Sequence, residues 1–419
     1  MPDAFARNRS FWIRLGWGLL VGLVGALGAL LFVVLMNLGI SLVWPEEPGP
    51  EPFSGSVRIL AIMTVAGLIV GLIHHFVEAE EMDEFGAMVK GMLDPRPVPG
   101  ALLVALTSLI GGFSVGPEVP TGLLGGGLAT WLSERRKLAP EIQRSNVLSG
   151  VMGAWGGLFT SPFAALVMPL ELTHQQTPGY YGTLTIVAAA AVLGFSIFYA
   201  FAGNAFASVL RILDLPAYSL RLWHLLLAVA LGVLGAILGL IFGLLLRSLK
   251  RLTAPLNSRP IIRGTAGGFL LGLLGMALPL TLFLGTSGLE VVTEQGAQLG
   301  LAVVIAMVFA KMLATAGAFS TGFIGGPIFP LLFVGGAAGT AVHLIIPDIP
   351  LALAVGCTMA AVPGALLPVP LALSVIVLLI TGIPATEAIP VFISAIAAYF
   401  ITHGLGLLGG GPTKEQNSR

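Results

Sequence analysis

Two short stretches, Gly116-Pro117-Glu118-Val119-Pro120 and Gly326-Pro327-Ile328-Phe329-Pro330, share the pattern G-P-x-x-P and lie 210 residues apart (116 to 326) in a chain of 419 residues. Each follows an apolar segment and precedes another that is rich in leucine and glycine. Proline suits the first turn of a helix, because the amide that it lacks would be unpaired there. The pattern therefore predicts two helix N-termini at equivalent places in two halves of the chain. Helix N-termini attract anions, so the same pattern indicates a site for anion transport.

The composition indicates an integral membrane protein. Hydrophobic residues make up 56% of the chain, charged residues 10%, and the mean hydropathy is +0.97, whereas soluble domains carry about 25% charged residues. The uncharged run from Leu15 to Trp44 exceeds the roughly 20 residues that cross a bilayer and the apolar core of a signal peptide, about 7–15 residues. A net charge of zero gives no sign of a nucleic-acid partner. The single cysteine, Cys357, reads as a small buried hydrophobe, and no cofactor or metal is expected.

Further apolar segments follow along the chain, and several are too short to span a bilayer alone. Glycine or proline separates them, which in two corresponding halves is typical of a transport site at mid-membrane. The run lengths and the lack of alternation exclude a transmembrane β-barrel. The expected segments are 59–76, 101–113, 123–132, 147–155, 162–172, 184–201, 222–246, 267–284, 299–313, 331–346, 351–362, 369–380 and 389–403.

A second match supports an internal duplication. Gly156 and Pro162 are separated by five residues, as are Gly364 and Pro370, and the offset between the pairs is close to that of the first motif. The expected division is a segment 1–14, a transmembrane domain 15–405 with halves of about 15–205 and 220–405, and a polar tail 406–419. The residues alone leave open whether the halves are parallel or inverted.

Basic residues give a partial orientation. Three arginines precede the first span, and three basic residues follow the span that begins at Leu222. By the positive-inside rule both clusters are cytoplasmic, so the N-terminus is expected inside; the side of a third cluster, 135–137, is not fixed. The clusters are Arg7, Arg9 and Arg14, and Arg247, Lys250 and Arg251.

The glycine- and proline-rich entries at 111–120 and 322–330 are the predicted walls of the pathway. Irregular backbone inside a bilayer must be shielded by protein or line an aqueous cavity, and free amides there can replace the water around an anion without binding it too tightly. The alternative is that each motif merely begins a helix that packs. The candidate pathway residues are Ser114, Val115, Gly116, Pro117, Glu118, Ile324, Gly326, Ile328 and Phe329, with Ser320 and Thr321 as additional hydroxyl donors.

The second motif and the residues before it resemble the CLC family of chloride channels and chloride/proton antiporters. The stretch from Lys311 to Pro330 is similar to the family pattern basic-x3-T-x4-S-S-G-x2-G-G-x-F-x-P. The segment 116–122 is similar to G-x-E-G-P-x-V-x-x-G, and 160–172 to a helix that reads N-A-P-(apolar)-E-E. The order of segments matches from Arg14 to about His403.

The resemblance implies an all-α polytopic membrane protein of two inverted-topology halves built from tilted, partly re-entrant helices. It also implies a homodimer with one anion pathway in each subunit. Placing Gly116-Pro117 on the family's G-P puts Val115 at the position of the gating glutamate. The family's internal proton-transfer glutamate falls on Leu172, beside Glu171.

Other features of the family are also altered. The serine loop falls near 83–87, which holds no serine, and the second-half aromatic is shifted to Phe329. The final helix with its anion-contacting tyrosine and the cytoplasmic nucleotide-binding modules have no match. These departures identify the chain as a divergent, prokaryotic-type relative.

Glu118 is the nearest carboxylate to the first motif, and two readings of it stay open. A carboxylate at a helix N-terminus is stabilised in its charged form, so Glu118 is either a gate that leaves when protonated or a simple helix cap. Lys311 is the only charge between Glu294 and Asp348. An intramembrane charge is a functional candidate, but here a structural salt bridge is preferred, with Glu171 as a possible partner.

Two polar segments lie at the end of the second apolar run, 59–76, and after it. His74-His75 is read as the polar end of a span rather than as a metal site. The acidic run 78–84 is read as a solvated cytoplasmic face; at an inner mouth it would disfavour anions.

The sequence therefore predicts a transporter rather than an enzyme, embedded in the lipid bilayer of a cell membrane, with a bacterial inner membrane expected. It moves a small inorganic anion, chloride in the simplest case, passively or through a gate. The alternative is a proton-coupled antiporter that uses Glu118, for chloride or for fluoride, nitrate or bicarbonate. A relative that has lost its site is a third reading.

Overall fold

A computed structural model describes residues 8–46, 49–77, 79, 86, 88, 91–159, 161–172, 180–210 and 213–407. Most of the acidic run 78–84, most of the segment 83–87, Thr160 and the tail from 408 onward lie outside these residues. The predictions made for them therefore stay predictions.

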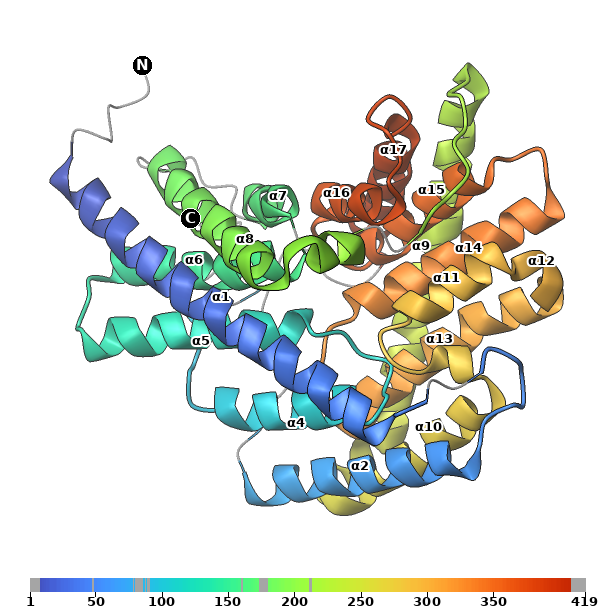
Figure 1. The fold of residues 1–419 in the computed structure, drawn as a ribbon, viewed down its shortest axis with the longest axis horizontal. Helices are drawn as coiled ribbons and strands as arrows, with labels where there is room; N and C mark the ends of the chain where they lie inside the picture. Colours follow the sequence, from blue (N-terminus) through green and yellow to red (C-terminus); the bar gives the residue numbers. More distant parts are fainter. Residues whose placement is uncertain are drawn as a thin grey trace.

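Helices form almost all of the described chain, and the one β-type pairing within it is an isolated bridge between Gly116 and Gly326 (Figure 1). In the first half the long helix α1 lies across α5, α6 and α8 (Figure 1). The helices of this half are α1 (Arg9–Val43), α2 (Val57–Phe76), α4 (Val98–Ile110), α5 (Glu118–Arg135), α6 (Pro140–Leu158), α7 (Pro162–Leu172) and α8 (Tyr180–Leu210).

The second half begins with the long helix α9, which packs on α13, α15 and α17. Its elements are α9 (Leu222–Thr253), η2 (Ala254–Leu256), α10 (Pro260–Ala277), η3 (Pro279–Thr281), α11 (Thr286–Glu294), α12 (Gly296–Leu299), α13 (Leu301–Thr321), α14 (Ile328–Ile345), α15 (Leu351–Gly364), α16 (Pro370–Thr381), α17 (Ile389–Tyr399) and η4 (Phe400–Gly404).

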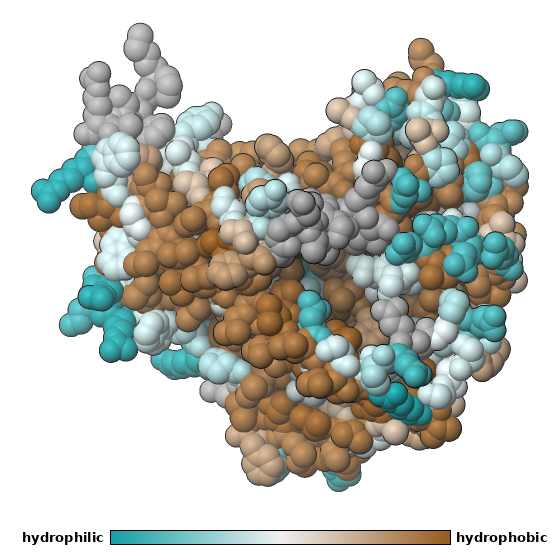
Figure 2. Space-filling view, viewed as in Figure 1, coloured by the Kyte–Doolittle hydropathy of each residue, from teal (hydrophilic) through white to brown (hydrophobic). Residues whose placement is uncertain are grey.

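Seven helices of the described chain are long and apolar enough to cross a membrane. They are α1, α2, α8, α9, α10, α13 and α14, and the described chain also has shorter apolar helices such as α7, α15 and α16. Hydrophobic side chains cover much of the face in Figure 2, while hydrophilic ones gather toward its margins. The predicted all-α polytopic membrane fold, with spanning and partial helices, is confirmed.

Proline and glycine decide where these helices begin and how closely they approach. Pro140, Pro260 and Pro370 are each the first residue of their helix, where the missing amide costs nothing. Helices α2 and α10 cross with glycines at the contact: a Cβ on Gly67 would overlap the Gly264 carbonyl. Small residues of this kind let helix backbones pack closely in membranes.

The two G-P-x-x-P motifs do begin helices, but one residue later than predicted. Pro117 and Pro327 are the N-cap residues of α5 and α14, and the helices themselves begin at Glu118 and Ile328. Glu118 is therefore the first helical residue of α5, which brings its side chain to the helix entry.

The second predicted match also corresponds to equivalent helices. Pro162 begins α7 and Pro370 begins α16, and these two short helices pack against each other. The largest hydrophobic cluster of the described residues joins side chains of both halves, among them Leu148 on α6 and Ala395 on α17. The halves therefore share one interior, in which α15 is almost wholly buried and α14 is buried along most of its length.

Candidate anion-binding junction

The two motifs meet face to face in the interior. The amide of Gly116 donates to the carbonyl of Gly326 at 2.7 Å, and the amide of Gly326 donates to the carbonyl of Gly116 at 2.7 Å. This antiparallel pair brings the N-termini of α5 and α14 to one point. We call the paired glycines and the two helix starts the junction.

The carboxylate of Glu118 crosses the junction from α5 to α14. Its side chain is 1% exposed, and Oε1 accepts a hydrogen bond from the Ile328 amide at 2.6 Å. The next amide, of Phe329, also interacts with the carboxylate. The carboxylate thus occupies the positive end of α14, where free amides and the helix dipole favour negative charge.

The second oxygen of this carboxylate, Oε2, is buried and has no hydrogen-bond partner among the described residues. A buried carboxylate oxygen without a partner is costly when charged, because water no longer solvates it. The same oxygen is a natural place for a proton.

Glycine is required on both sides of this carboxylate. A Cβ on Gly116 or on Gly326 would overlap the carboxylate of Glu118 in each case. Neither glycine has a positive φ, so the requirement comes from space and not from backbone conformation. The paired glycines therefore form the seat in which the carboxylate lies.

Trp155 on α6 holds the main chain of Glu118 and was missed in the sequence. Its indole Nε1 donates to the Glu118 carbonyl at 2.8 Å, and the hydroxyl of Thr121 donates to the same carbonyl at 3.0 Å. Trp155 is 1% exposed, and a buried indole N–H needs an acceptor. A tryptophan inside an apolar segment was the available signal, but the sequence could not name its acceptor.

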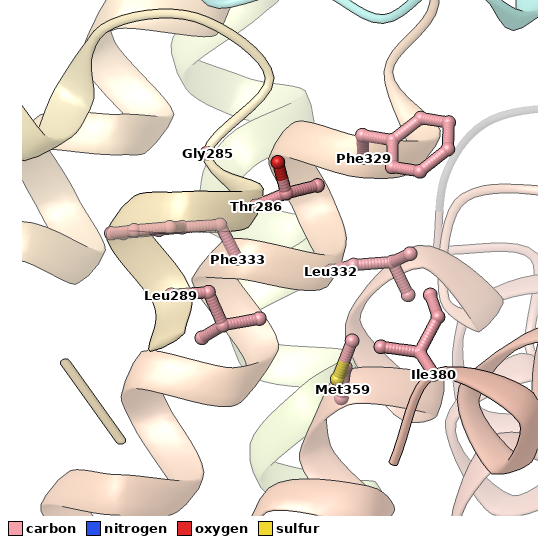
Figure 3. Close-up of a pocket in the computed structure, with 8 residues that line it drawn as sticks. All are labelled: Gly285, Thr286, Leu289, Phe329, Leu332, Phe333, Met359 and Ile380. Carbon is pink, nitrogen blue, oxygen red and sulfur yellow. The ribbon is translucent and has the colours of Figure 1, made fainter. Parts of the chain in front are cut away.

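Aromatic rings line one side of the junction. Trp155 meets Phe159 edge to face at 5.8 Å between ring centroids, and Phe159 stacks on Phe329 at 6.2 Å. Phe329 also borders a small, mostly apolar pocket between α11, α14 and α15 (Figure 3). This predicted pathway residue is thus beside the Glu118 carboxylate.

The loop before α5 is buried and tied to α13. Ser114 Oγ hydrogen-bonds Thr315 Oγ1 at 2.8 Å, a contact that the sequence analysis did not foresee. Val115 is fully buried, and a Cβ on Gly325 would meet its Cβ at 2.5 Å. Ile324 lies in the same hydrophobic cluster as Val115. Ser114 is therefore near the junction as predicted, but its hydroxyl already has a partner.

Ser320 and Thr321 are less suited to contact an anion than expected. Both hydroxyls donate to the carbonyl of Gly317 in their own helix, at 3.0 Å and 2.7 Å. The structure therefore does not direct their protons toward the junction.

The salt bridge predicted between Lys311 and Glu171 is wrong. Lys311 Nζ donates instead to the carbonyls of Thr281, Leu282 and Phe283. These carbonyls belong to the turn between α10 and α11, which is distant in sequence and could not be identified as a partner from spacing.

Glu171 lies at a different helix start. Its two carboxylate oxygens accept from the amides of Leu371 at 2.8 Å and Ala372 at 2.9 Å. These amides open α16, so Glu171 caps α16 much as Glu118 caps α14. From the sequence, Glu171 was identified as the neighbour of Leu172 and as a partner for Lys311, but this cap was not predicted.

His74 makes a structural contact. Its Nε2 lies 2.7 Å from the carbonyl of Gly322 at the end of α13. Gly322 has φ +96°, a left-handed conformation that favours glycine and ends the helix. Within the described residues there is no group of three potential metal ligands.

Known proteins resemble this chain over most of its length. A sequence model of the family described as "voltage gated chloride channel" matches residues 62–403. The ion-transport protein YfeO of Escherichia fergusonii is 27% identical over 364 residues, which cover 81% of this chain and 82% of that protein.

Two solved structures are similar in fold. A slow cyanobacterial Cl−/H+ antiporter has a TM-score of 0.77 at 20% sequence identity, and the matched residues cover 94% of this chain and 97% of the antiporter chain. A CLC-type fluoride/proton antiporter has a TM-score of 0.72 at 20% sequence identity, and the matched residues cover 96% of this chain and 98% of that antiporter chain.

Proposed function

Since the chain belongs to the voltage gated chloride channel family, whose members are transporters and not enzymes, we propose that it moves a small inorganic anion, chloride in the first instance, across the membrane. The anion passes the junction of Gly116 with Gly326, and Glu118 gates that passage. Each subunit of a homodimer carries one pathway.

The observation that carries this proposal is the contact between the Glu118 carboxylate and the N-terminus of α14. A halide at this helix end would bind the same amides, so the carboxylate and the anion compete for one place. Amides carry only partial charges, which allows an anion to bind and to leave again. Protonation makes the carboxyl group neutral and weakens its attraction to the helix end.

The pairing of the motifs supports a placement in which Glu118, rather than Val115, stands at the position of the family's gating glutamate. The symmetric bridge makes Gly116 the counterpart of Gly326 and Glu118 the counterpart of Ile328. Placing Gly116 on the first glycine of G-x-E-G-P-x-V-x-x-G puts Glu118 on the glutamate. Pro120 and Gly125 then fall on the proline and the last glycine.

Proton-coupled exchange is the second candidate. The buried Oε2 of Glu118, with no partner among the described residues, favours it because a proton there removes an unsatisfied charge. Two proteins of similar fold are named as Cl−/H+ and fluoride/proton antiporters. Fluoride is therefore the next anion to test after chloride, followed by nitrate and bicarbonate.

The test uses purified protein in liposomes loaded with the anion, with efflux and proton movement recorded together. Glu118→Gln keeps the shape of the side chain and removes its charge, so efflux at neutral pH should rise toward the wild-type rate at low pH and lose its pH dependence. Glu141→Gln, at an exposed position in the first turn of α6, is the matched control and should behave as wild type.

The outcomes separate the candidates. Wild-type pH dependence in Glu118→Gln would remove the gate. Proton uptake driven by the anion gradient and lost in Glu118→Gln supports exchange, whereas anion efflux without protons supports a channel. Absence of flux for all four anions would refute both the channel and the proton-coupled exchanger.

The remaining sequence predictions belong to the same proposal. We place the N-terminus and the end of α9 on the cytoplasmic side, because both carry clusters of basic residues. We assign the protein to a bacterial inner membrane, and the transmembrane domain to about 15–405.

A further inference from the structure

Lys311 is a charged residue deep in the protein that the proposed gate does not use. It is 0% exposed on α13. Its Nζ donates to the backbone carbonyls of Thr281 at 2.9 Å, Leu282 at 3.2 Å and Phe283 at 2.8 Å. The ring of Phe333 on α14 lies 5.2 Å from Nζ.

These contacts fit the charged form of the side chain. An ammonium group has three N–H donors and no acceptor, and three carbonyls surround it. A neutral amine would turn a lone pair toward one of these carbonyls. An aromatic ring face next to the nitrogen also favours a cation.

The charge of Lys311 is not cancelled by a nearby carboxylate. Among the described residues, the groups that contact Nζ are three backbone carbonyls and the ring of Phe333, and none of them is a carboxylate. Burying a charge without an ion-pair partner is costly, and carbonyl dipoles solvate it without removing its net charge. The field of Lys311 therefore reaches its surroundings through a medium of low dielectric constant.

Two routes connect Lys311 to the junction over short distances. Thr315, one turn further along α13, bonds to Ser114, which stands four residues before Glu118. Phe333 is on the second turn of α14, the helix whose first amide binds Glu118.

The turn in front of α11 places Lys311 behind the pocket wall. A Cβ on Gly285 would lie 3.0 Å from Nζ, which leaves no room for a side chain between them. Figure 3 shows Phe333 beneath the turn of Gly285 and Thr286, and Phe329 at the other side of the pocket. Lys311 is therefore near the pathway but separated from it by Gly285 and Phe333.

We propose that Lys311 is a fixed positive charge that raises the affinity of the junction for anions from behind its wall, without touching the anion. The inference rests on the proposed function. The ring of Phe333 lies 5.2 Å from Nζ, and the start of α14 is five residues away, which is roughly 7.5 Å of helix rise. The charge and the junction are therefore on the order of 10 Å apart, and at an effective dielectric constant of about 20 the Coulomb attraction over this distance changes anion affinity by about tenfold.

Lys311 also holds the turn 281–283, and a purely structural role must be distinguished from the electrostatic one. Phe283 has φ +54°, unfavourable for a bulky residue, and its amide donates to the carbonyl of Gly112 at 2.9 Å. Loss of this support would lower the amount of folded protein and the maximal rate. Loss of the charge would instead raise the anion concentration that gives half-maximal flux.

The experiment compares chloride efflux from liposomes over a range of chloride concentrations for wild type, Lys311→Gln and Lys311→Arg, with thermal stability measured in parallel. Glutamine keeps two donors but no charge, so we expect its half-saturating chloride concentration to rise about tenfold. Arginine keeps the charge, so its half-saturating concentration should stay within about twofold of wild type.

A second pair leaves Lys311 and its carbonyl contacts in place. Thr286→Glu adds a negative charge next to Gly285, and Thr286→Gln is its neutral control. We expect a higher half-saturating chloride concentration for the glutamate variant than for the glutamine variant. This pair tests, with Lys311 unchanged, whether a charge at this turn acts on anion affinity at the junction at all.

The inference is overturned if Lys311→Gln saturates as wild type does, if Lys311→Arg is impaired as much as Lys311→Gln, or if the two Thr286 variants are alike. Wild-type protein that transports none of the anions would overturn the proposed function, and this inference with it. Normal wild-type transport with an unchanged Lys311→Gln would overturn this inference alone.

Discussion

Gly326→Ala tests whether the glycine pair is the seat of the Glu118 carboxylate. The φ of Gly326 is not positive, so alanine fits the backbone, but its Cβ would overlap the carboxylate. The end of a flexible side chain moves more readily than a helix start. We therefore expect the variant to fold with Glu118 displaced from α14.

The energetic cost follows from the bond that is lost. Glu118 Oε1 accepts from the Ile328 amide at 2.6 Å, and a hydrogen bond to a charged group contributes about 1.5–3 kcal/mol. If the overlap with Glu118 is the only effect, Gly326→Ala should lower the free energy of unfolding by this amount in wild type and by almost nothing in Glu118→Ala. The coupling energy of the double-mutant cycle is then about 1.5–3 kcal/mol.

The assay is equilibrium unfolding in mixed detergent micelles, with anion efflux as a function of pH as a second readout. Gly16→Ala, at an exposed position on α1 with no atom near its added Cβ, controls for the glycine-to-alanine change. The reasoning is refuted if Gly326→Ala costs the same in both backgrounds, or if the pH dependence of efflux survives it unchanged.

Two further predictions concern the neighbouring contacts. Trp155→Phe removes the indole donor to the Glu118 carbonyl. Because Thr121 still donates to that carbonyl, the free energy of unfolding should fall by only about 1 kcal/mol, and the pH midpoint of efflux should shift. An unchanged midpoint would show that Trp155 does not position the gate. Glu171→Gln leaves one acceptor oxygen for the two amides at the start of α16. The free energy of unfolding should therefore fall by about 1–2 kcal/mol in the same assay. Equal stability of the variant and the wild type would mean that this cap contributes nothing.

Much of the fold was accessible from the sequence because it depends on local properties. Long apolar runs predicted the spanning helices, and proline positions predicted helix starts to within one residue, as at Glu118 and Ile328. The apolar segment predicted at 267–284 was wrong in its bounds. Helix α10 begins at Pro260 and ends at Ala277, after which the chain turns toward Lys311.

The sequence located the two motifs of the candidate site but not the contacts between them. The repeat of Gly116 and Gly326 indicated two equivalent helix starts, and Glu118 was recognised as the carboxylate nearest to the first of them. From the sequence, Val115 was predicted at the position of the gating glutamate. A second placement, with Gly116 on the first glycine of the family pattern, matches about equally well and puts Glu118 there. The partner of Lys311 was predicted wrongly. A carboxylate is the usual partner of a buried lysine, whereas every residue has a backbone carbonyl, so the residue types do not indicate which carbonyls bind.

The sequence by itself determined that this chain is a helical membrane protein in which a G-P-x-x-P helix entry occurs twice, because hydropathy, run length and proline placement act over a few turns of chain. Only the tertiary structure decided that the Glu118 carboxylate sits on the N-terminus of α14, that Trp155 holds its main chain, and that Lys311 faces three carbonyls. These contacts join residues far apart in the chain. Their geometry depends on how the two halves pack, which no local pattern encodes.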